Sequence, residues 1–217
     1  MNFELTEDQL AIKMAARDFA ENEIAPTQIE RDKEAKFPYE IVKKMGELGF
    51  MGMMVAPEWG GAGMDTISYV CAMEEISKVD ASVGVIMSVN NSLVCFGIEK
   101  WGSDFLKDKY LKPLASGQKL GAFCLSEHEE GSDHTAKKTT DAKQGHFYVL
   151  NGMKNWITNG TTADYYFMQA MTNPELGYKG ISTFIVEKEM AGVETGVKED
   201  KLGIRGSDTC SIGLNNV

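Results

Sequence analysis

The chain has 217 residues, a formal net charge of -10 and 43% hydrophobic residues, which is the composition of an ordinary globular protein. The length allows one large domain or two small ones, with a sizeable core in either case. The negative charge argues against a nucleic acid or an anionic membrane surface as partner, because both need a positive field. It leaves room for a small anionic ligand, since a few local Lys or Arg side chains can hold one.

The first residues and the cysteines indicate the compartment. Residues 1–8 are acidic and resemble neither a signal peptide nor a transit peptide, so we expect a cytoplasmic protein of bacterial type. The longest apolar run, residues 83–89, is too short to span a bilayer. The three histidines are far apart and no Cys-x-x-Cys pair exists, so no metal site is expected. The scattered cysteines predict buried free thiols in a reducing compartment; they are Cys71, Cys95, Cys124 and Cys210.

The first half of the sequence has the periodicity and capping signals of helices. Thr6 and Gln9 form a capping box that opens a helix, and Pro26 is expected to end it. Pro38 suits the first turn of a second helix. The buried stripe of that second helix is expected at Ile41, Val42, Met45 and Leu48.

Further helices and a glycine-rich loop complete this half. Asp65 and Ser103 are expected to be N-caps, and the stretch 80–100, apolar all round, predicts a helix central to the domain. The loop 60–63 imitates a dinucleotide fingerprint, but it lacks the third glycine and follows a helical sequence in place of a strand. We therefore interpret this loop as a tight turn between helices.

After Gly117 the hydrophobic period changes from helical to alternating. Residues 147–150 and 153–158 predict a hairpin, because the Asn151-Gly152 pair between them is the strongest two-residue turn signal. Further strands are expected at residues 120–125, 165–172, 180–188 and 210–214.

Helices first and strands second predict two segregated parts in place of an alternating parallel sheet. We expect an α+β protein with an N-terminal all-α domain, residues 1–116, followed by a small antiparallel β-barrel or β-sandwich domain, residues 117–217.

Two stretches of the second half carry groups suited to a flat, polar-edged aromatic ligand. Residues 121–133 predict a buried strand that ends in Ser126, followed by an acidic loop and a Gly-Ser-Asp turn. Residues 155–160 place Trp156 and Thr158 before an Asn-Gly pair. A capped strand end, a core tryptophan and a turn threonine explain the same residues structurally, so both interpretations stay open at this point.

Six segments in order resemble the acyl-CoA dehydrogenase family, most closely its short-chain, butyryl-CoA-type members. Each segment is a weak signal alone, but their order and spacing together are specific, and the resemblance covers the whole chain. The segments are residues 57–63 (PEWGGAG), 120–127 (LGAFCLSE), 131–133 (GSD), 150–160 (LNGMKNWITNG), 180–187 (GISTFIVE) and 198–209 (KEDKLGIRGSDT).

The resemblance implies an N-terminal helical domain, a middle β-domain and a C-terminal four-helix domain, with FAD bound between the last two. Ser126 would bond the pyrimidine edge of the flavin, Thr158 would donate toward N5 or the neighbouring carbonyl, and Trp156 would pack beside the ring. The implied cofactor contacts are Phe123, Cys124, Leu125, Ser126, Ser132, Trp156, Ile157 and Thr158.

The resemblance also implies substrate contacts. Ser132 would touch the pantetheine arm of an acyl-CoA, and the central helix near residues 86–96 would shape the acyl pocket. The loop before Ser132 departs from the family, because His128 and Glu130 stand where proline and alanine are usual. The loss of proline is expected to loosen this loop.

The implied reaction is the FAD-dependent α,β-dehydrogenation of a short-chain acyl-CoA to the trans-2-enoyl-CoA, with electrons passed to an electron-transferring flavoprotein. The α C–H of a thioester is a weak acid, so the site must stabilise enolate charge away from water. Hydride transfer needs flavin N5 close to the β-carbon.

The catalytic glutamate and most of the tetramer interface of the family belong to the C-terminal helices. We therefore expect the base beyond Val217, no catalytic residue within these 217 residues, and a homotetramer for the full-length protein. The alternatives are a non-catalytic interaction module that reuses the two domains, and an acyl-CoA oxidase or flavin monooxygenase relative.

Overall fold

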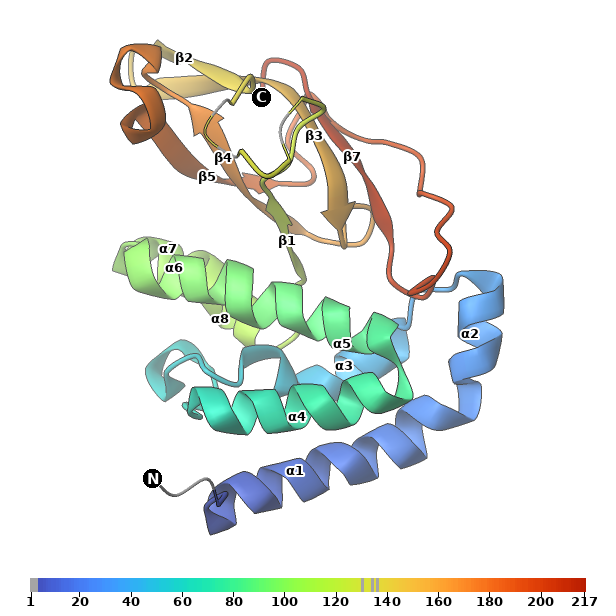
Figure 1. The fold of residues 1–217 in the computed structure, drawn as a ribbon. Coiled ribbons are helices and arrows are strands. Elements are labelled where there is room, and N and C mark those ends of the chain that lie inside the picture. The colour runs from blue at the N-terminus through green and yellow to red at the C-terminus, as the bar shows by residue number, and fades with distance from the viewer. Residues whose placement is uncertain (1–3, 130, 134, 136) are drawn as a thin grey trace. The chain divides into compact units, whose positions relative to one another are not determined.

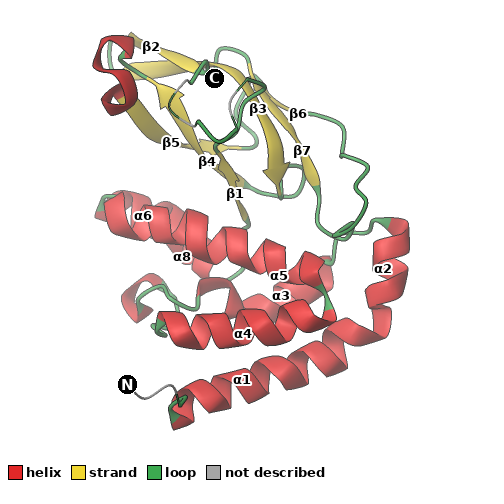
Figure 2. Ribbon diagram, in the orientation of Figure 1, coloured by secondary structure: helices red, strands yellow, loops and turns green. Residues whose placement is uncertain are grey.

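The computed structural model describes residues 4–129, 131–133, 135 and 137–217, and for residues 141–144 it describes the backbone (Figure 1). Two compact units make up the chain. The helical unit consists of Met1–Lys119 and Asp200–Ser207, and the strand unit of Leu120–Glu199 and Asp208–Val217. The α-helices and the strands occupy different parts of the molecule (Figure 2), and the α-helices precede the strands along the chain, which confirms the α+β class.

The helical unit consists of α-helices joined by short π-helical and 3-10 turns. Among the described residues the α-helices are α1 (Glu7–Phe19), α2 (Gln28–Glu34), α3 (Tyr39–Glu47), α4 (Thr66–Val79), α5 (Ala81–Ser88), α6 (Phe96–Trp101), α7 (Asp104–Leu106) and α8 (Lys112–Ala115).

The predicted helix caps are present, but one predicted helix end is wrong. The Thr6 hydroxyl accepts from the Gln9 amide, and the Gln9 side chain accepts from the Thr6 amide. Asp65 and Ser103 cap α4 and α7 through their side chains. The helical path does not stop before Pro26, because π-helical and 3-10 turns carry it into α2. Pro26 lies in the first turn of the 3-10 segment, where its missing N–H costs no hydrogen bond.

The second predicted helix, α3, buries most of its expected stripe. Ile41, Val42 and Met45 are buried, as predicted. Leu48 is 58% exposed, because the helix ends at Glu47 and Leu48 is already its C-cap. The prediction for Leu48 is therefore wrong.

The central helix predicted at residues 80–100 is present. Helix α5, a π-helical turn (Val89–Cys95) and α6 form one helical path, Ala81–Trp101, with a mean hydropathy of 1.6 in its most apolar window. Among the described residues, this is the one helix that is long and apolar enough to cross a membrane. Because 67% of that window is buried inside the structure, it has the character of a core helix.

Two adjacent asparagines in the π-helical turn bind the segment that follows α3. The Asn91 side chain accepts from the Met53 amide at 2.8 Å and donates to the Phe50 carbonyl at 2.9 Å. The Asn90 side chain donates to the Met51 carbonyl at 2.9 Å. These buried polar groups are therefore satisfied by backbone partners and hold the loop against the central helix.

The strand unit is a mixed sheet with the order β1-β4-β2-β3-β7-β6, and β5 pairs with β4. Strand β1 runs parallel to β4, with Gly121 opposite Tyr165, so the sheet is not wholly antiparallel. Among the strand pairings of the described residues, none closes this sheet into a barrel. The strands are β1 (Gly121–Cys124), β2 (Thr140–Gln144), β3 (Phe147–Thr158), β4 (Tyr165–Met171), β5 (Ile181–Glu187), β6 (Val193–Thr195) and β7 (Thr209–Leu214).

The predicted hairpin at Asn151-Gly152 is wrong, because β3 is a single strand of 12 residues. Its first part pairs with β2 and its second part with β7, so Gly152 lies where the strand changes partner. Gly152 has a φ of 148°, and a Cβ there would lie 2.6 Å from Thr139 Oγ1. The glycine thus permits a close approach of two backbones within the sheet.

The core of the strand unit lies among the inward-facing residues of β1, β3, β4, β5 and β7. All four cysteines of the chain are among the described residues, and each is a buried free thiol, as predicted. The buried core residues of this unit are Ala122, Cys124, Leu150, Ile157, Ala163, Tyr166, Met168, Ala170, Val186, Cys210, Ile212 and Leu214.

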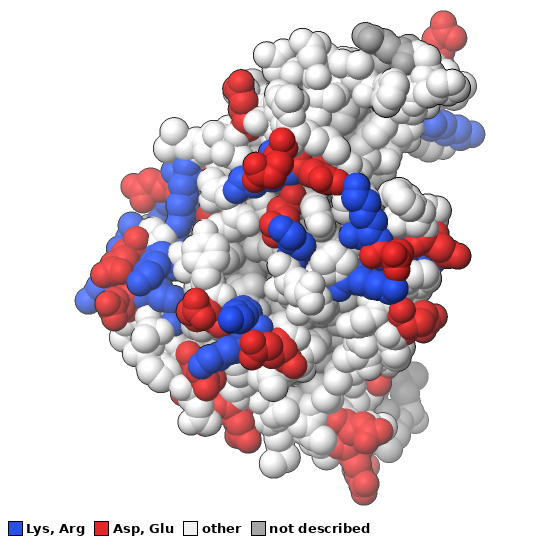
Figure 3. All heavy atoms as spheres, turned by 180° about the vertical axis from the view of Figure 1, so that it is seen from behind, with Lys and Arg blue, Asp and Glu red and all other residues white. Residues whose placement is uncertain are grey.

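Charged side chains of both signs share the molecular surface. On the face shown in Figure 3, Lys and Arg side chains lie among Asp and Glu side chains. This face therefore presents no field of a single sign.

Candidate flavin-binding site

The two predicted flavin segments lie side by side in the strand unit. The Asn155 amide, next to Trp156, donates to the Ser126 carbonyl at 2.9 Å. The Asn159 side chain donates to the Gly121 carbonyl at 3.1 Å. The segment that contains β1 is thus hydrogen-bonded to the end of β3 at two points. The two predicted flavin segments, which are about 30 residues apart in the sequence, are neighbours in the structure.

A bulge in β3 turns Trp156 out of the sheet. The β3–β7 register shifts between Lys154 and Ile157, and Trp156 has a φ of 59°. In a regular strand Lys154 and Trp156 would face the same side. With one extra residue, Lys154 and Ile157 point inward, at 0% and 2% exposure, and Trp156 is 67% exposed. The core-tryptophan alternative is therefore wrong, and the indole is free to pack against a planar ligand.

The remaining predicted contacts on the two strands differ in what they can offer. Ser126 and Thr158 are half-buried hydroxyls just beyond β1 and at the end of β3. Cys124 and Ile157 are buried in the core, so only their backbone can face a ligand. Burial raises the pKa of the Cys124 thiol and keeps it protonated.

The two apolar residues of the first segment flank Cys124. Phe123 is half-buried and stacks on Phe167, with ring centroids 6.1 Å apart and an interplanar angle of 30°. Leu125 is half-buried, and its carbonyl accepts from Lys137 Nζ at 3.1 Å. Both therefore support the strand end that carries Ser126.

The acidic loop carries the least constrained predicted contact. Ser132 is exposed, and the neighbouring Asp133 carboxylate accepts from the Thr135 amide at 3.0 Å. Exposed His128 borders a cavity of about 170 Å³ in this loop. Glu130 lies outside the described residues. The approach of Ser132 to flavin or substrate stays a prediction.

A buried ion pair under the two segments was missed by the sequence reasoning. Lys154 Nζ lies 2.6 Å from Glu127 Oε1, and it also donates to the Gln169 carbonyl at 2.5 Å. The Glu127 carboxylate accepts from the backbone amides of Lys138 at 2.7 Å and Thr139 at 3.0 Å. The sequence offered one signal for this pair. Lys154 interrupts the apolar pattern of a predicted strand, and Glu127 directly follows Ser126 at the end of another.

The protonation of this pair follows from its surroundings. Burial by itself raises the pKa of Glu127, but the hydrogen bonds from Lys154, Thr139 and Lys138 outweigh it and hold its pKa below the ordinary value. Glu127 is therefore a carboxylate near neutral pH. Burial lowers the pKa of Lys154, and the contact with Glu127 opposes that change.

A second missed residue, Asp208, holds the turn that follows Thr158. Its carboxylate accepts from the Thr161 amide and hydroxyl, both at 2.5 Å, and from the Thr162 hydroxyl at 2.8 Å. The Asp208 carbonyl accepts from the Asn159 amide at 3.1 Å. Asp208 is buried, so these contacts replace water as the partners of its charge.

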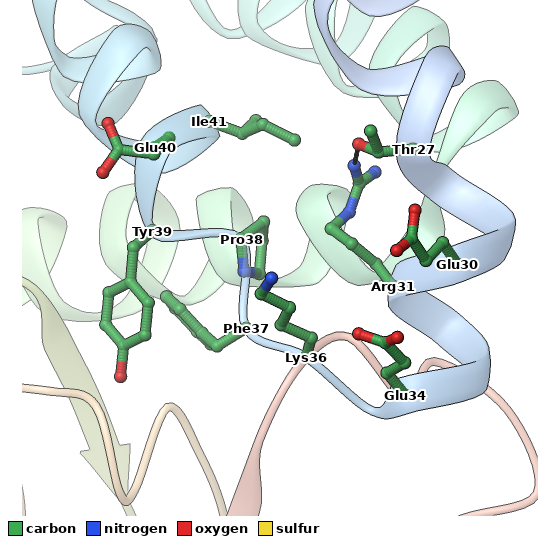
Figure 4. A pocket seen from close by; sticks show the side chains of 10 residues that line it. All are labelled: Thr27, Glu30, Arg31, Glu34, Lys36, Phe37, Pro38, Tyr39, Glu40 and Ile41. Atoms are coloured by element: carbon green, nitrogen blue, oxygen red, sulfur yellow. Dashed lines mark hydrogen bonds between the residues drawn. The ribbon is translucent and has the colours of Figure 1, made fainter.

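The helical unit holds a larger cavity of about 370 Å³ between α2 and α3 (Figure 4). Figure 4 shows Arg31 directed toward Thr27, to which it donates. Its guanidinium also forms a buried ion pair with Asp80 at 2.8 Å. The charge of Arg31 is thus already paired, and none of the predicted flavin contacts lines this cavity.

A further cavity of about 350 Å³ in the helical unit borders the central helix through Asn91 and Phe96. Apolar side chains such as Met54, Val55 and Met64 also line it. The predicted acyl-pocket role of this helix stays a prediction.

The residues present fit one side of a flavin. Hydroxyls at two adjacent strand ends can bond a polar ring edge, and an exposed indole beside them can cover a ring face. Trp156 in particular combines a left-handed backbone conformation with a large exposed side chain, and strained backbone of this kind clusters at ligand sites.

Two domain families match this chain in order. The acyl-CoA dehydrogenase N-terminal domain family matches residues 6–118, and the acyl-CoA dehydrogenase middle domain family matches residues 122–217. The short-chain specific acyl-CoA dehydrogenase of Clostridium acetobutylicum is 46% identical over 98% of this chain and 56% of its own length. The human mitochondrial short-chain specific enzyme is 49% identical over 96% of this chain and 51% of its own length. The 3-(aryl)acrylate reductase of Clostridium sporogenes is 46% identical over 98% of this chain and 56% of its own length.

Solved structures share the fold. Butyryl-CoA dehydrogenase from Megasphaera elsdenii aligns with a TM-score of 0.95 at 39% identity, over the whole of this chain and 58% of that one. A chain from a study of the electron transferring flavoprotein of Acidaminococcus fermentans gives a TM-score of 0.97 at 45% identity, over the whole of this chain and 57% of that one. Glutaryl-CoA dehydrogenase from Mycobacterium smegmatis, solved with FADH2, gives 0.92 at 33% identity, over 98% of this chain and 54% of that one.

These relatives extend well beyond the region of similarity, since the chain spans about half the length of the curated proteins it matches. Both domain families match in order and together cover nearly all of the 217 residues. One of these relatives, the glutaryl-CoA dehydrogenase, was solved with FADH2, which agrees with the fit of the two strand ends to a flavin. The chain belongs to the acyl-CoA dehydrogenase family.

Proposed function

We propose that this chain forms the helical and flavin-facing parts of a dehydrogenase that converts a short-chain acyl-CoA into the trans-2-enoyl-CoA. The observation that carries the proposal is the hydrogen bond from Asn155 to Ser126, which sets the two flavin segments of the family side by side. The similarity to short-chain specific enzymes at 46% and 49% identity supports the chain-length class.

Each residue of the site has a defined task in this proposal. The Ser126 and Thr158 hydroxyls would hold the polar edge of the flavin, Ser126 at its pyrimidine side and Thr158 toward the reacting side. Trp156 would pack beside the flavin and keep water from the reacting carbons. FAD, when bound, supplies the acceptor for the hydride that leaves the β-carbon. Ser132 contacts the pantetheine arm and holds the thioester in register.

We propose that the proton-abstracting base belongs to the C-terminal helices that the family resemblance implies. A carboxylate there removes the α-proton, and electrons leave the site through an electron-transferring flavoprotein. The study that contains the similar chain from Acidaminococcus fermentans supports this partner. We further propose that the full-length protein is a homotetramer and lies in the cytoplasm. Its first two domains would be residues 1–116 and 117–217.

One relative favours a second candidate function. The 3-(aryl)acrylate reductase of Clostridium sporogenes is as similar to this chain as the enzyme of Clostridium acetobutylicum, at 46% identity. The second candidate is therefore the reverse reaction, in which an aryl-substituted acrylate is reduced at its α,β double bond.

The test uses the protein expressed from its complete gene. Butyryl-CoA is expected to bleach the bound flavin and to give the enoyl-CoA with a dye acceptor, and the rate should fall for longer acyl chains. Reduction of an aryl acrylate by the pre-reduced protein, without bleaching by butyryl-CoA, would favour the second candidate. Oxygen consumption equal to the dye-coupled rate would identify an oxidase, and a colourless protein that takes up no FAD would overturn both candidates.

A further inference from the structure

The Glu127–Lys154 ion pair is almost wholly buried, and Glu127 lines the small cavity of the acidic loop. Glu127 is 6% exposed and Lys154 is 0% exposed, and their charged atoms are 2.6 Å apart. A buried ion pair gains little over an apolar pair of the same volume, because desolvation offsets the attraction. Stability alone is therefore a weak reason for such a pair at this place.

The pair gathers four separate pieces of the strand unit at one point. Glu127 follows β1, and it accepts from the backbone amides of Lys138 and Thr139 just before β2. Lys154 belongs to β3, and it donates to the carbonyl of Gln169 in β4. Charge-assisted hydrogen bonds of this kind are short and directional, so they fix distances more tightly than apolar packing does.

The pair also closes a small ring of contacts with the flavin-facing backbone. Ser126 is covalently joined to Glu127, and Lys154 is covalently joined to Asn155. The ion pair links Glu127 to Lys154, and the Asn155 amide returns to the Ser126 carbonyl at 2.9 Å. A shift of either charged side chain therefore moves the Ser126 carbonyl relative to Asn155.

The bulge couples this ring to Trp156. Lys154 points inward, and Trp156, two residues later, points outward because of the extra residue between them. The inward anchor at Lys154 thus fixes where the strand begins to bulge, and the bulge fixes where the indole emerges.

We propose that Glu127 and Lys154 are positioning residues of the flavin site, whose ion pair sets the spacing between Ser126 and Trp156. The part of this proposal that concerns flavin binding rests on the proposed function. It adds two buried residues that act through their chain neighbours, Ser126 and Asn155.

The test is a double-mutant cycle in the protein expressed from its complete gene, with E127Q, K154M and the double variant. Each single variant leaves one buried charge without its partner and is expected to lower the Tm. The double variant removes both charges, so its Tm should recover most of the loss. The FAD dissociation constant should rise about tenfold or more in all three variants, and the flavin absorption bands should shift in all three.

Two kinds of control accompany the cycle. E129Q and K138M remove an exposed ion pair from the same loop and should change neither FAD affinity nor Tm. V186A shortens a buried side chain of β5 and should lower the Tm without shifting the flavin bands. FAD affinity that recovers in the double variant in step with its Tm would overturn the positioning role, since a merely structural pair behaves that way.

A second readout does not need the cofactor. The Asn155 amide should exchange with deuterium at least tenfold faster in the cofactor-free double variant than in the cofactor-free parent protein. If the parent protein takes up no FAD, the proposed function fails, and this exchange rate alone decides the positioning role. Unchanged protection of the Asn155 amide in the cofactor-free double variant would refute it.

Discussion

The Asn159 side chain donates to the Gly121 carbonyl over 3.1 Å and thereby ties the residue after β3 to the first residue of β1. Asn159 is fully buried and has a φ of 63°, a conformation that asparagine and glycine adopt more readily than other residues. One side chain thus provides both a backbone shape and a link between the two flavin segments.

This double role predicts different outcomes for two substitutions. N159G keeps the backbone conformation and loses the link, at an expected cost of about 1 kcal/mol. N159A loses the link and also strains the backbone, so it should cost about 2 kcal/mol. Urea unfolding of the strand unit measures both values. Equal losses in the two variants would show that the left-handed backbone at this position costs alanine nothing.

The Asp208 carboxylate, which binds the turn after Thr158, is expected to contribute strongly to the stability of the strand unit. D208N keeps the shape of the side chain but replaces charged acceptors for Thr161 and Thr162, so the stability loss should be about 2 kcal/mol. D200N removes an exposed carboxylate whose nearest cation is 3.8 Å away and should change stability by less than about 0.5 kcal/mol. Chemical denaturation of the two variants provides the comparison, and similar losses would contradict the assignment.

Gly152 is predicted to reject any side chain. G152A would place a methyl group 2.6 Å from Thr139 Oγ1 at a φ of 148°, so the expected loss is about 2 kcal/mol or more. Gly131 has open space around its Cβ position, and G131A serves as the matched control, with little expected change. Thermal unfolding monitored by circular dichroism separates the two cases. A neutral G152A would mean that β2 and β3 can move apart at this point.

Glu75 predicts how the helical unit responds to acid. Hydrogen bonds from Arg17 at 3.0 Å and from Lys78 at 2.9 Å lower its pKa from 4.5 to about 2. Because the pKa of Glu75 is lower in the folded than in the unfolded state, its ionisation stabilises the fold. This contribution is fully present above pH 4.5 and is lost as the pH falls toward 2. We expect a loss of about 1 to 2 kcal/mol over this range, since Arg17 and Lys78 are half exposed and screened.

The measurement is urea unfolding at several pH values between 2 and 7. E75Q should remove most of the pH dependence in this window, whereas E74Q, which alters a half-exposed neighbour, should retain it. A parent protein whose helical unit is equally stable at pH 5 and pH 2.5 would refute the role of Glu75.

The helical part of the fold was predictable because its signals are local. The Thr6–Gln9 box, the Asp65 cap and the Ser103 cap depend on residues three positions apart, and all are present. The helix expected to stop at Pro26 continued because a proline is tolerated in the first turn of a new helical segment.

The sheet was less predictable because its pairings are not local. Asn151-Gly152 has the composition of a hairpin turn, yet the partner strands β2 and β7 hold it extended. The parallel pairing of β1 with β4 and the outward turn of Trp156 likewise depend on contacts that no window of the sequence contains. The predicted contacts at Ser126 and Thr158 came from the family resemblance, and the Glu127–Lys154 pair emerged only from three-dimensional proximity.

The change of partner along β3 has a consequence for where the chain can be cut and rejoined. New termini at the exposed turn around Gly145, between β2 and β3, would leave β3 whole, and a circular permutant opened there should fold. New termini at Asn151-Gly152, where the amino-acid sequence alone suggests a turn, would cut β3, the strand that joins β2 to β7. The strand unit would then separate into a piece with β1, β2, β4 and β5 and a piece with β6 and β7, and refolding yield would tell the two permutants apart.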